Sequence, residues 1–518
     1  MRMTIKMIKE NKLYTLFSFL FLFFLISSFV FYYGTGFGNF VSLFGVVIVS
    51  LILSPVMMRG VVWLCDRSYE PSKRTDGEAT VKMSDRFMPL IYVTVLFILQ
   101  MPVFLAFYPG IIFYDIGTQI EQYETGMYAA NHPLIHTLFM GYMKNLYEDP
   151  NRGYALATII QLLIADSCIS YVLAWLKKNT RAVVAWGLLL FIGLNPVFSL
   201  LFISSTKDII FAALLSVVFV DLIRIIAEDV SLMSLARMVI IGILMILMRS
   251  NAAYAFIPSA AVLLLIFRKS KALLRRIIIY LVCVVVLGIG INKILIASLD
   301  AYKGSIKEMM SIPAQIDGRI YLEVADSEEQ ELIRKYIPEP EQYNYYISDP
   351  IKKQFEFDTV DSQCKHYLLD TTILALKHPI VAIDAVMYNT QGFWDMFHSA
   401  YQEEHQYVAR SGDYRGGATT DSKLPGLMSL YMEHFRLMDF EGWNLLAVFA
   451  QMGIYIWMLV FALTKSVKQG DKAIMAGCLL MFIYLLTVLL GPSAIMRYGL
   501  PFMIVGPVAV ALSFVKKE

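Results

Sequence analysis

Residues 88–119 read Met88-Pro-Leu-Ile-Tyr-Val-Thr-Val-Leu-Phe-Ile-Leu-Gln-Met-Pro-Val-Phe-Leu-Ala-Phe107-Tyr-Pro-Gly-Ile-Ile-Phe-Tyr-Asp115-Ile-Gly-Thr-Gln119. The first part is apolar up to Phe107, and about twenty such residues cross the hydrocarbon core of a bilayer as one helix. Tyr108-Pro-Gly110 then ends that helix, because proline lacks an amide donor and glycine permits a turn. The polar residues that follow therefore lie at a membrane surface. If that surface faces outward, Asp115 is the best candidate for a chemical residue.

The composition of the chain places it in the bilayer. Hydrophobic residues make up 58% of its 518 positions and charged residues only 17%, which is typical of a polytopic membrane protein. The net charge of +2 is too small to suggest nucleic acid as a partner. The five cysteines are scattered, without a disulfide framework or the spacing of a zinc site.

Apolar runs of membrane length predict twelve transmembrane helices. They fall near 13–33, 38–58, 88–107, 153–176, 182–203, 208–227, 237–249, 252–267, 275–297, 443–464, 473–491 and 495–514. We interpret the N-terminal apolar run as a retained first helix, because no convincing cleavage site follows it. Residues 134–147 are amphipathic and too short to span, so we expect them along the outer interface.

Clusters of lysine and arginine set the expected orientation. They follow the second, fourth, eighth and tenth spans, and the alternate loops at 34–37, 204–207 and 491–494 hold only Lys207. By the positive-inside rule, both termini are then cytoplasmic in a multi-pass plasma-membrane protein. Reading 237–267 as one helix would invert everything downstream, but the basic cluster at 268–276 argues against that.

The expected fold class is an all-α polytopic membrane protein of about twelve transmembrane helices, with a small outer-face domain. Its expected regions are an N-terminal two-helix addition with a cytoplasmic loop (1–87), a transmembrane module with a first outer loop at 108–152 (88–297), an outer-face segment (298–442) and C-terminal transmembrane helices (443–518).

Asp115 opens a predicted helix in the first outer loop. Asp115, Gln119 and Gln122 would share one face of that helix. The alternative is that Asp115 merely caps the helix, which is an ordinary use of aspartate at such a position.

Two histidines follow in Asn131-His132-Pro133-Leu-Ile-His136, which we expect to start another helix with both imidazoles on one face. A metal site would need further ligands, of which Asp115 could supply one. Hydrogen bonding to substrate or simple packing is the better interpretation of this spacing. No metal site or required cofactor is indicated, although a divalent metal stays possible.

The turn Ser204-Ser-Thr-Lys207-Asp208 is expected on the outer side between two spans. One interpretation is a capped hairpin with a local pair between Lys207 and Asp208. The other is a phosphate-binding cation held by its neighbouring acid.

Two further cations interrupt apolar sequence near the outer leaflet. Arg249-Ser-Asn251 lies between two short spans, and an arginine there usually snorkels, lines a cavity or pairs with an anion. Arg497-Tyr498 opens the last span, where such residues bind a lipid phosphate or anchor the helix at the interface. Together with Asp115, the histidines and Lys207, these cations all fall at the outer face. This arrangement suits a phosphate-linked amphiphile.

The order of these motifs resembles the GT-C class of membrane glycosyltransferases, and more closely a set of uncharacterised bacterial multi-pass proteins related to it. The resemblance covers about residues 88–515. Its matching pieces are Tyr108-Pro-Gly-Ile with Tyr114-Asp115 and Gln119, Asn131-His-Pro-Leu-Ile-His-Thr137, Ser205-Thr-Lys-Asp208, Arg249-Ser-Asn251, Ser311-Ile-Pro-Ala-Gln315 with Arg319, His378-Pro379 with Gly392-Phe-Trp394, and Arg497-Tyr498 with Pro501.

The resemblance implies an enzyme that takes a sugar from a polyprenyl-phosphate carrier at the outer membrane face and passes it to a glycan or lipid acceptor of the cell envelope. Asp115 matches the acidic residue that serves the acceptor, although many members carry a paired acid where this chain has Tyr114-Asp115. The expected reaction is inverting displacement with Asp115 as general base. The implied substrate-binding residues are Gln119, His132, His136, Lys207, Asp208, Arg249, Asn251, Ser311, Gln315, Arg497 and Tyr498.

Two other functions stay open from sequence. A polysaccharide polymerase or ligase would place essential arginines in the long outer segment, where Arg319, Arg410 and Arg415 are candidates. A transporter or flippase would carry buried charges into the cytoplasmic half of its spans, where we find few beyond Asp166 and Asp221.

Overall fold

A computed structural model describes residues 7–34, 36–67, 69, 83–249, 251–303, 306–355, 357–397, 417–434 and 450–515. This part of the chain is helical, and its extended segments pair only as isolated bridges, which join Tyr69 to Val515, Ile111 to Ser204, and Ala129 to Tyr302. The predicted all-α fold is therefore confirmed.

Eight of the described helices are long and apolar enough to cross a membrane, so the chain is a multi-pass membrane protein. They are α2 (Lys12–Tyr33), α3 (Phe40–Cys65), α4 (Met83–Ala106), α7 (Pro150–Asn179), α10 (Lys207–Ala227), α13 (Lys271–Ser298), α23 (Lys472–Leu489) and α24 (Met496–Ser513). Shorter helices of the same bundle are α8 (Ala182–Leu194), α9 (Pro196–Phe202), α11 (Leu232–Met248), α12 (Asn251–Phe267) and α22 (Met452–Gln469).

These eight helices coincide with eight of the twelve predicted spans. The predicted span at 182–203 is instead the pair α8 and α9, bent by 65° where Pro196 starts a new helix. Part of the predicted span at 443–464 lies outside the described residues. A second pair, Gln363–Lys377 and Pro379–Asn389, is bent by 112° and was not predicted as a span. Counting both pairs gives up to ten spans, so the predicted count of twelve stays a prediction.

Helices α11 and α12 run in opposite directions, and α11 packs against α10. Arg249 at the end of α11 pairs with Asp208 in the first turn of α10, at 2.8 Å. Arg276 near the start of α13 pairs with Asp229, which lies just beyond the end of α10. Because α12 connects these two places, it runs back from the end of the bundle where α10 begins toward the end where α10 ends, packed against α13 and α23. The residues 237–267 therefore form two helices and not one.

Helix α10 lies at the centre of the bundle, packed by α7, α11, α23 and α24. Its apolar residues surround the whole helix, and 89% of its most apolar window is buried. A helix that is apolar all round is stable where other helices cover every face. This central position brings the first turn of α10 into contact with several other helix ends.

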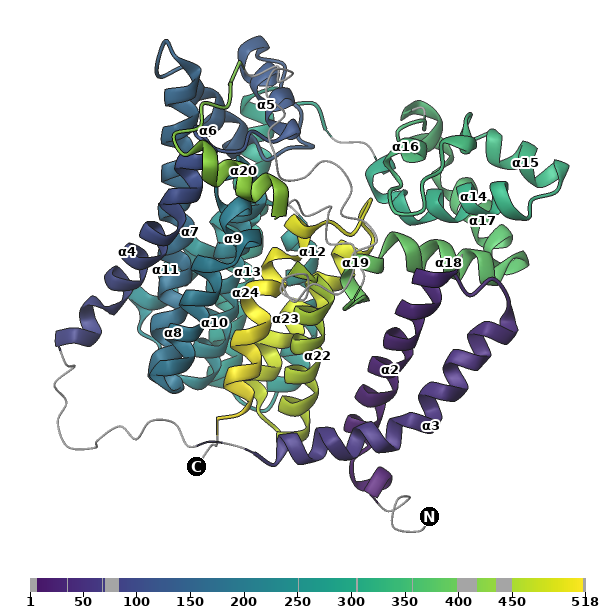
Figure 1. Ribbon diagram of the computed structural model, residues 1–518, viewed down its shortest axis with the longest axis horizontal. Helices are drawn as coiled ribbons and strands as arrows, with labels where there is room; N and C mark the ends of the chain where they lie inside the picture. The colour runs from purple at the N-terminus through teal and green to yellow at the C-terminus, as the bar shows by residue number, and fades with distance from the viewer. Residues whose placement is uncertain are drawn as a thin grey trace.

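The remaining helices gather at one end of the bundle (Figure 1). They are α5 (Tyr114–Thr125), α6 (Leu134–Lys144), α14 (Ser311–Glu323), α15 (Ser327–Arg334), α16 (Asp349–Lys352), α17 (Phe357–Lys377), α18 (Pro379–Asn389), α19 (Gln391–Trp394) and α20 (Pro425–His434), with short 3-10 turns at Ile306–Met309 and Pro340–Gln342. Helices α14 to α17 enclose a hydrophobic cluster of their own.

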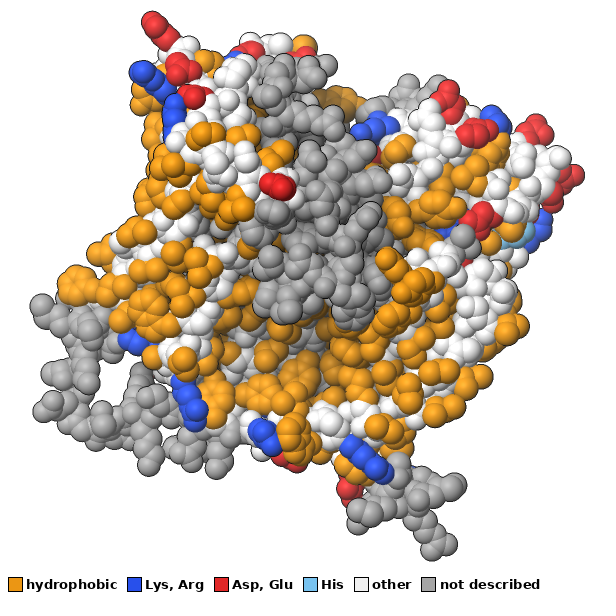
Figure 2. All heavy atoms as spheres, viewed as in Figure 1, with side chains coloured by type: hydrophobic (Ala, Val, Ile, Leu, Met, Phe, Trp, Pro, Cys, Tyr) orange, Lys and Arg blue, Asp and Glu red, His pale blue; other side chains and the backbone are white. Residues whose placement is uncertain are grey.

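The opposite end of the bundle carries basic clusters. Trp175, next to the lysines that end α7, donates its indole N–H to Glu228 beyond α10 at 2.9 Å. Lys468 at the end of α22 donates to the carbonyl of Glu10, which precedes α2, at 2.6 Å. Figure 2 shows lysine and arginine side chains along this lower edge, beneath a broad apolar belt.

The N-terminal hairpin of α2 and α3 packs beside α22 and is tied to α18. The carboxylate of Asp384 accepts from the backbone N–H groups of Phe37 and Gly38 at 2.8 and 3.0 Å, in the loop between the two helices. Ser28 on α2 donates its hydroxyl to Asp395 at 2.6 Å. Hydrogen bonds to Asp384 on α18 and to Asp395 just after α19 therefore attach the N-terminal hairpin to the rest of the protein.

Candidate functional site

Two loops at the end of the bundle that carries α5 and α6 pair with each other. Ile111 N–H donates to the carbonyl of Ile203 at 2.9 Å, and Ser205 N–H donates to the carbonyl of Ile111 at 2.8 Å. Phe113 N–H donates to the hydroxyl oxygen of Ser205 at 3.1 Å. Because the pairing is parallel and both loops lead directly into helices, the first turns of α5 and α10 lie beside each other.

Gly110 allows the first loop to approach the second. Its φ is +115°, and a Cβ atom there would lie 2.5 Å from the Thr158 hydroxyl and 2.9 Å from the Ile203 carbonyl. Gln161 on α7 donates to the carbonyl of Ser204 at 2.7 Å, which fixes the second loop to the bundle. The Pro-Gly turn predicted from sequence therefore serves to position the residues after it.

Asp115 lies in the first turn of α5 and faces two cations. Its Oδ2 accepts from Lys207 Nζ and from an Arg497 guanidinium nitrogen, both at 2.9 Å. The side chains of Asp115 and Lys207 are each 13% exposed and that of Arg497 is 4% exposed. The N-cap of α5 is Phe113, and Asp115 makes no capping bond. The alternative that Asp115 merely caps the helix is therefore wrong.

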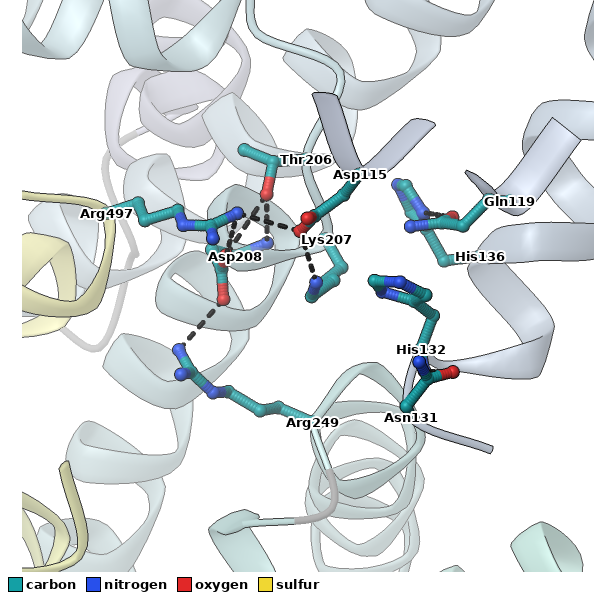
Figure 3. Close-up of polar contacts among 10 residues, drawn as sticks. All are labelled: Asp115, Gln119, Asn131, His132, His136, Thr206, Lys207, Asp208, Arg249 and Arg497. Carbon is teal, nitrogen blue, oxygen red and sulfur yellow. Dashed lines mark hydrogen bonds and ion pairs between the residues drawn. The ribbon is translucent and has the colours of Figure 1, made fainter. Parts of the chain in front are cut away.

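Asp208 is the second carboxylate of the site and is fully buried. Its Oδ1 accepts from Arg249 at 2.8 Å, and its Oδ2 lies 3.6 Å from Arg497 and accepts the Thr206 hydroxyl at 3.1 Å. Thr206 also caps α10 by accepting from the Asp208 N–H. Lys207 and Asp208 do not pair with each other. Lys207 pairs with Asp115 on α5, and Asp208 pairs with Arg249 at the end of α11 (Figure 3).

Aromatic rings hold the arginines in place. The Arg249 guanidinium lies 4.2 Å from the ring centroid of Tyr498, and that of Arg497 lies 4.8 Å from that of Phe113. Such stacking favours arginine in partly desolvated positions. Phe113 was not identified as a site residue from sequence, because nothing marks it within an apolar run. Thr206 was expected only as part of a capped turn, and it does cap α10.

The charged cluster, which we define as Asp115, Lys207, Asp208, Arg249 and Arg497, has three cations and two carboxylates. It therefore carries one net positive charge. Burial alone would raise the pKa of Asp115, but Lys207 and Arg497 hold it well below its ordinary value. The Asp115 carboxylate is thus ionised and, while both cations contact it, a weak base.

Gln119 and His136 form a second, neutral pair beside the charged cluster (Figure 3). His136 Nδ1 lies 2.7 Å from Gln119 Oε1, and both side chains are buried. Burial and the nearby Lys207 lower the pKa of His136 to about 3. The same two causes lower the pKa of His132 to about 4, so both imidazoles are neutral near pH 7.

The prediction that His132 and His136 share one helix face is wrong. Helix α6 begins at Leu134 with Pro133 as its N-cap, so His132 precedes the helix. Proline disfavours helical backbone at the residue before it, which explains this boundary. Backbone pairing of residues 128–130 with Tyr302 holds the loop that carries His132. Figure 3 places the His132 ring beside Lys207 and next to the Gln119–His136 pair.

Other residues predicted from the resemblance do not join the charged cluster. Ser311 and Gln315 are buried in α14, where Gln315 donates to the carbonyl of Asn344 and to Asn389 at 3.0 and 3.1 Å. Helices α14 and α5 lie on opposite sides of the upper end of the bundle in Figure 1. The side chain of Asn251 lies outside the described residues.

Two alternative functions rested on other residues. Arg319 is buried in α14, where it lies 3.1 Å from Glu323, while Arg410 and Arg415 lie outside the described residues. Asp221, one of the two acids noted for a transporter, pairs with Arg237 on α11 at 2.7 Å. Across the described residues, no three His, Cys, Asp or Glu side chains gather as a metal site would require.

Residues 120–518 match a family of unknown function, DUF6020. This match covers more than half of the chain, so the protein belongs to that family. It includes every member of the charged cluster except Asp115. Searches of curated proteins and of solved structures find no match to the chain.

Proposed function

We propose that this member of the DUF6020 family is a glycosyltransferase that moves a sugar from a polyprenyl-phosphate carrier to a cell-envelope glycan or lipid. The observation that carries the proposal is the contact of Asp115 with Lys207 and Arg497, at the ends of helices in a membrane bundle. A carboxylate beside an anion-binding group is what transfer from a phosphate-linked sugar requires.

The proposed orientation puts the charged cluster at the outer face of the plasma membrane. The positive-inside rule assigns the end of the bundle with the basic clusters to the cytoplasm. The N-terminal end of α2 and the C-terminal end of α24 lie at that end of the bundle (Figure 1), which agrees with two cytoplasmic termini. A lipid carrier would then present its phosphate to the charged cluster from the outer leaflet.

The charged cluster suits a phosphodiester. Its one net positive charge matches the single negative charge of a phosphate that links a prenyl chain to a sugar. Helices α10 and α24 begin at this place, and helix N-termini add partial positive charge toward an anion. Lys207 and Arg497 are the first candidates for phosphate contacts, because both contact the Asp115 carboxylate, which is 13% exposed, whereas Arg249 pairs with the fully buried Asp208.

The reaction would be an inverting displacement. The acceptor hydroxyl oxygen forms a bond to the anomeric carbon, and the bond from that carbon to the phosphate oxygen breaks. The phosphate leaves with the electron pair, stabilised by Lys207, Arg497 and Arg249. Asp115 takes the proton of the acceptor hydroxyl. Gln119, His132 and His136 would position hydroxyl groups.

Donor binding would itself prepare the base. In the resting protein Lys207 and Arg497 keep Asp115 weakly basic. When a phosphate takes over these cations, their effect on the carboxylate falls and its pKa rises toward its ordinary value. Asp115 would therefore gain basicity only in the presence of a donor, which disfavours proton abstraction without transfer.

Transfer should stop when Asp115 is replaced by asparagine and expression is unchanged. The assay compares envelope glycans and prenyl-linked sugars of cells that lack the protein, carry it, or carry the variant. We expect the null and variant cells to accumulate the same prenyl-phosphate sugar. A matched control is Glu124→Gln, which removes one negative charge from the same helix but from an exposed pair with Lys144. Undiminished transfer by Asp115→Asn would exclude the assigned role.

A further inference from the structure

The Gln119–His136 pair has unused hydrogen-bonding capacity on both side chains. Gln119 Nε2 and His136 Nε2 are buried and have no hydrogen-bond partner among the described residues. Both side chains are at most 1% exposed. Buried polar atoms in native proteins almost always have partners, and leaving them unpaired costs free energy.

The pair offers both a donor and an acceptor whichever way its protons are arranged. If Gln119 Oε1 accepts from His136 Nδ1–H, the free groups are the two N–H bonds of the Gln119 amide as donors and His136 Nε2 as acceptor. If the amide is reversed, one amide N–H donates to His136 Nδ1, and the free groups are the other amide N–H and His136 Nε2–H as donors and Gln119 Oε1 as acceptor. Protonation of the imidazole is disfavoured near pH 7 because burial and Lys207 lower the pKa of His136 to about 3.

A neutral set that holds both donors and an acceptor is complementary to a hydroxyl group, which donates once and also accepts. It is a poor match for a phosphate, which only accepts, or for an ammonium group, which only donates. Gln119 lies one helical turn beyond Asp115 on α5, and the pair lies on the side of the charged cluster where His132 lies (Figure 3).

We propose that the Gln119–His136 pair is a hydroxyl-binding subsite that selects the sugar-bearing substrate, while the charged cluster binds its phosphate. This inference rests on the proposed function for the identity of the substrate as a sugar. The hydroxyl belongs either to the donor sugar or to a sugar acceptor, and the experiment below separates these two sources.

The test measures binding to the full-length protein in detergent. The probes are citronellyl phosphate, which has an anion and no sugar, and a panel of citronellyl-phosphoryl hexoses. A donor subsite predicts that the wild type binds one of these sugar conjugates about tenfold more tightly than the sugar-free phosphate. Gln119→Met and His136→Phe should each abolish that preference and leave the affinity for citronellyl phosphate unchanged. Retained phosphate binding also reports that the variants are folded.

A matched control is Gln122→Met on the same helix. Gln122 is also buried, but its Oε1 accepts from the Ala129 N–H at 3.3 Å, so it has a structural partner. This variant should keep the sugar preference of the wild type. If it loses the preference as fully as Gln119→Met does, general disturbance of α5 is the cause and the subsite is excluded.

An acceptor subsite predicts a different result. Methyl hexosides should then bind in the presence of saturating citronellyl phosphate, and this binding should be lost in Gln119→Met and His136→Phe. If both variants retain the wild-type preference for conjugates and for methyl hexosides, the inference is overturned. A wild type that binds no citronellyl phosphate would overturn the proposed function. In that case the subsite stands only if methyl hexosides raise the melting temperature of the wild type and not of the two variants.

Discussion

Replacing Asp115 by asparagine should strengthen the binding of a prenyl phosphate while it abolishes transfer. A phosphate can reach Lys207 and Arg497 only in competition with the Asp115 carboxylate, which contacts both at 2.9 Å. Asparagine has nearly the same shape and no charge. The variant therefore removes the competitor and leaves the two cations in place.

The expected gain in affinity follows from Coulomb's law. A phosphate that shares these cations would lie roughly 5 Å from the Asp115 carboxylate, where two like charges repel by about 3 kcal/mol at an effective dielectric constant near 20. Full relief of that repulsion corresponds to roughly a hundredfold in the dissociation constant. Because the side chains relax and Asp115 is 13% exposed, we expect about tenfold or more.

The assay is equilibrium binding of citronellyl phosphate to the wild type, to Asp115→Asn and to Glu124→Gln. The control changes the charge of α5 by the same amount, at an exposed pair, and should leave the dissociation constant within about twofold because solvent screens surface charges. Binding to Asp115→Asn that equals or falls below that of the wild type would refute the idea that carboxylate and phosphate compete for these cations.

Three further predictions concern stability. Asp208→Asn and Arg249→Met should each lower the free energy of unfolding by about 3–5 kcal/mol, because each leaves its buried partner with an unpaired charge. The double variant should lose much less stability than the two single losses combined. Thermal unfolding of all three variants in detergent tests this. Gly110→Ala should sharply reduce the yield of folded protein, measured by size-exclusion chromatography, because its Cβ would meet the Thr158 hydroxyl at 2.5 Å. Burial raises the pKa of Asp317 in α14 to about 7, so the folded protein favours the protonated carboxyl. The free energy of unfolding should therefore fall as pH rises from about 4 to about 7. The melting temperature of Asp317→Asn should not show this fall.

Each of these three has a contrary outcome. Strictly additive losses for the two charge variants would mean that they do not interact. A normal yield of folded Gly110→Ala would show that the two paired loops can separate without cost. A melting temperature of the wild type that stays level between pH 4 and 7, or falls equally in Asp317→Asn, would exclude that carboxyl as the source.

Local signals predicted the membrane helices and the cations of the site. Apolar length alone is enough for α10, and Tyr108-Pro-Gly110 marks a helix end wherever it occurs. Arg249 and Arg497 stand out because a charge in an apolar run is costly, and Lys207 stands out as the only basic residue in the short alternate loops. These signals depend only on neighbouring residues, so they can be read without the fold.

What could not be predicted depends on contacts between distant segments. The spacing of Asp115 fits both a helix cap and an ion pair, and only the register of the loops at 111–113 and 203–205 decides between them. The bent pair of α17 and α18 reads as polar sequence broken by His378-Pro379, so its apolar part was missed. Likewise, Pro133 moves the start of α6 past His132, which helical periodicity alone does not reveal.

The pairing of Asp115 with Arg497 joins residues separated by 382 positions, and its second cation, Lys207, lies 92 positions away. A ribosome therefore delivers the acid first, one of its partners after α9, and the other only with α24. Until α24 has entered the bilayer, the two carboxylates lack a shared counterion at a place with little access to water. The nascent protein thus acquires its complete cluster only once α24 has been made, and a chain that stops before α24 keeps two cations and two carboxylates, without the net positive charge of the complete cluster.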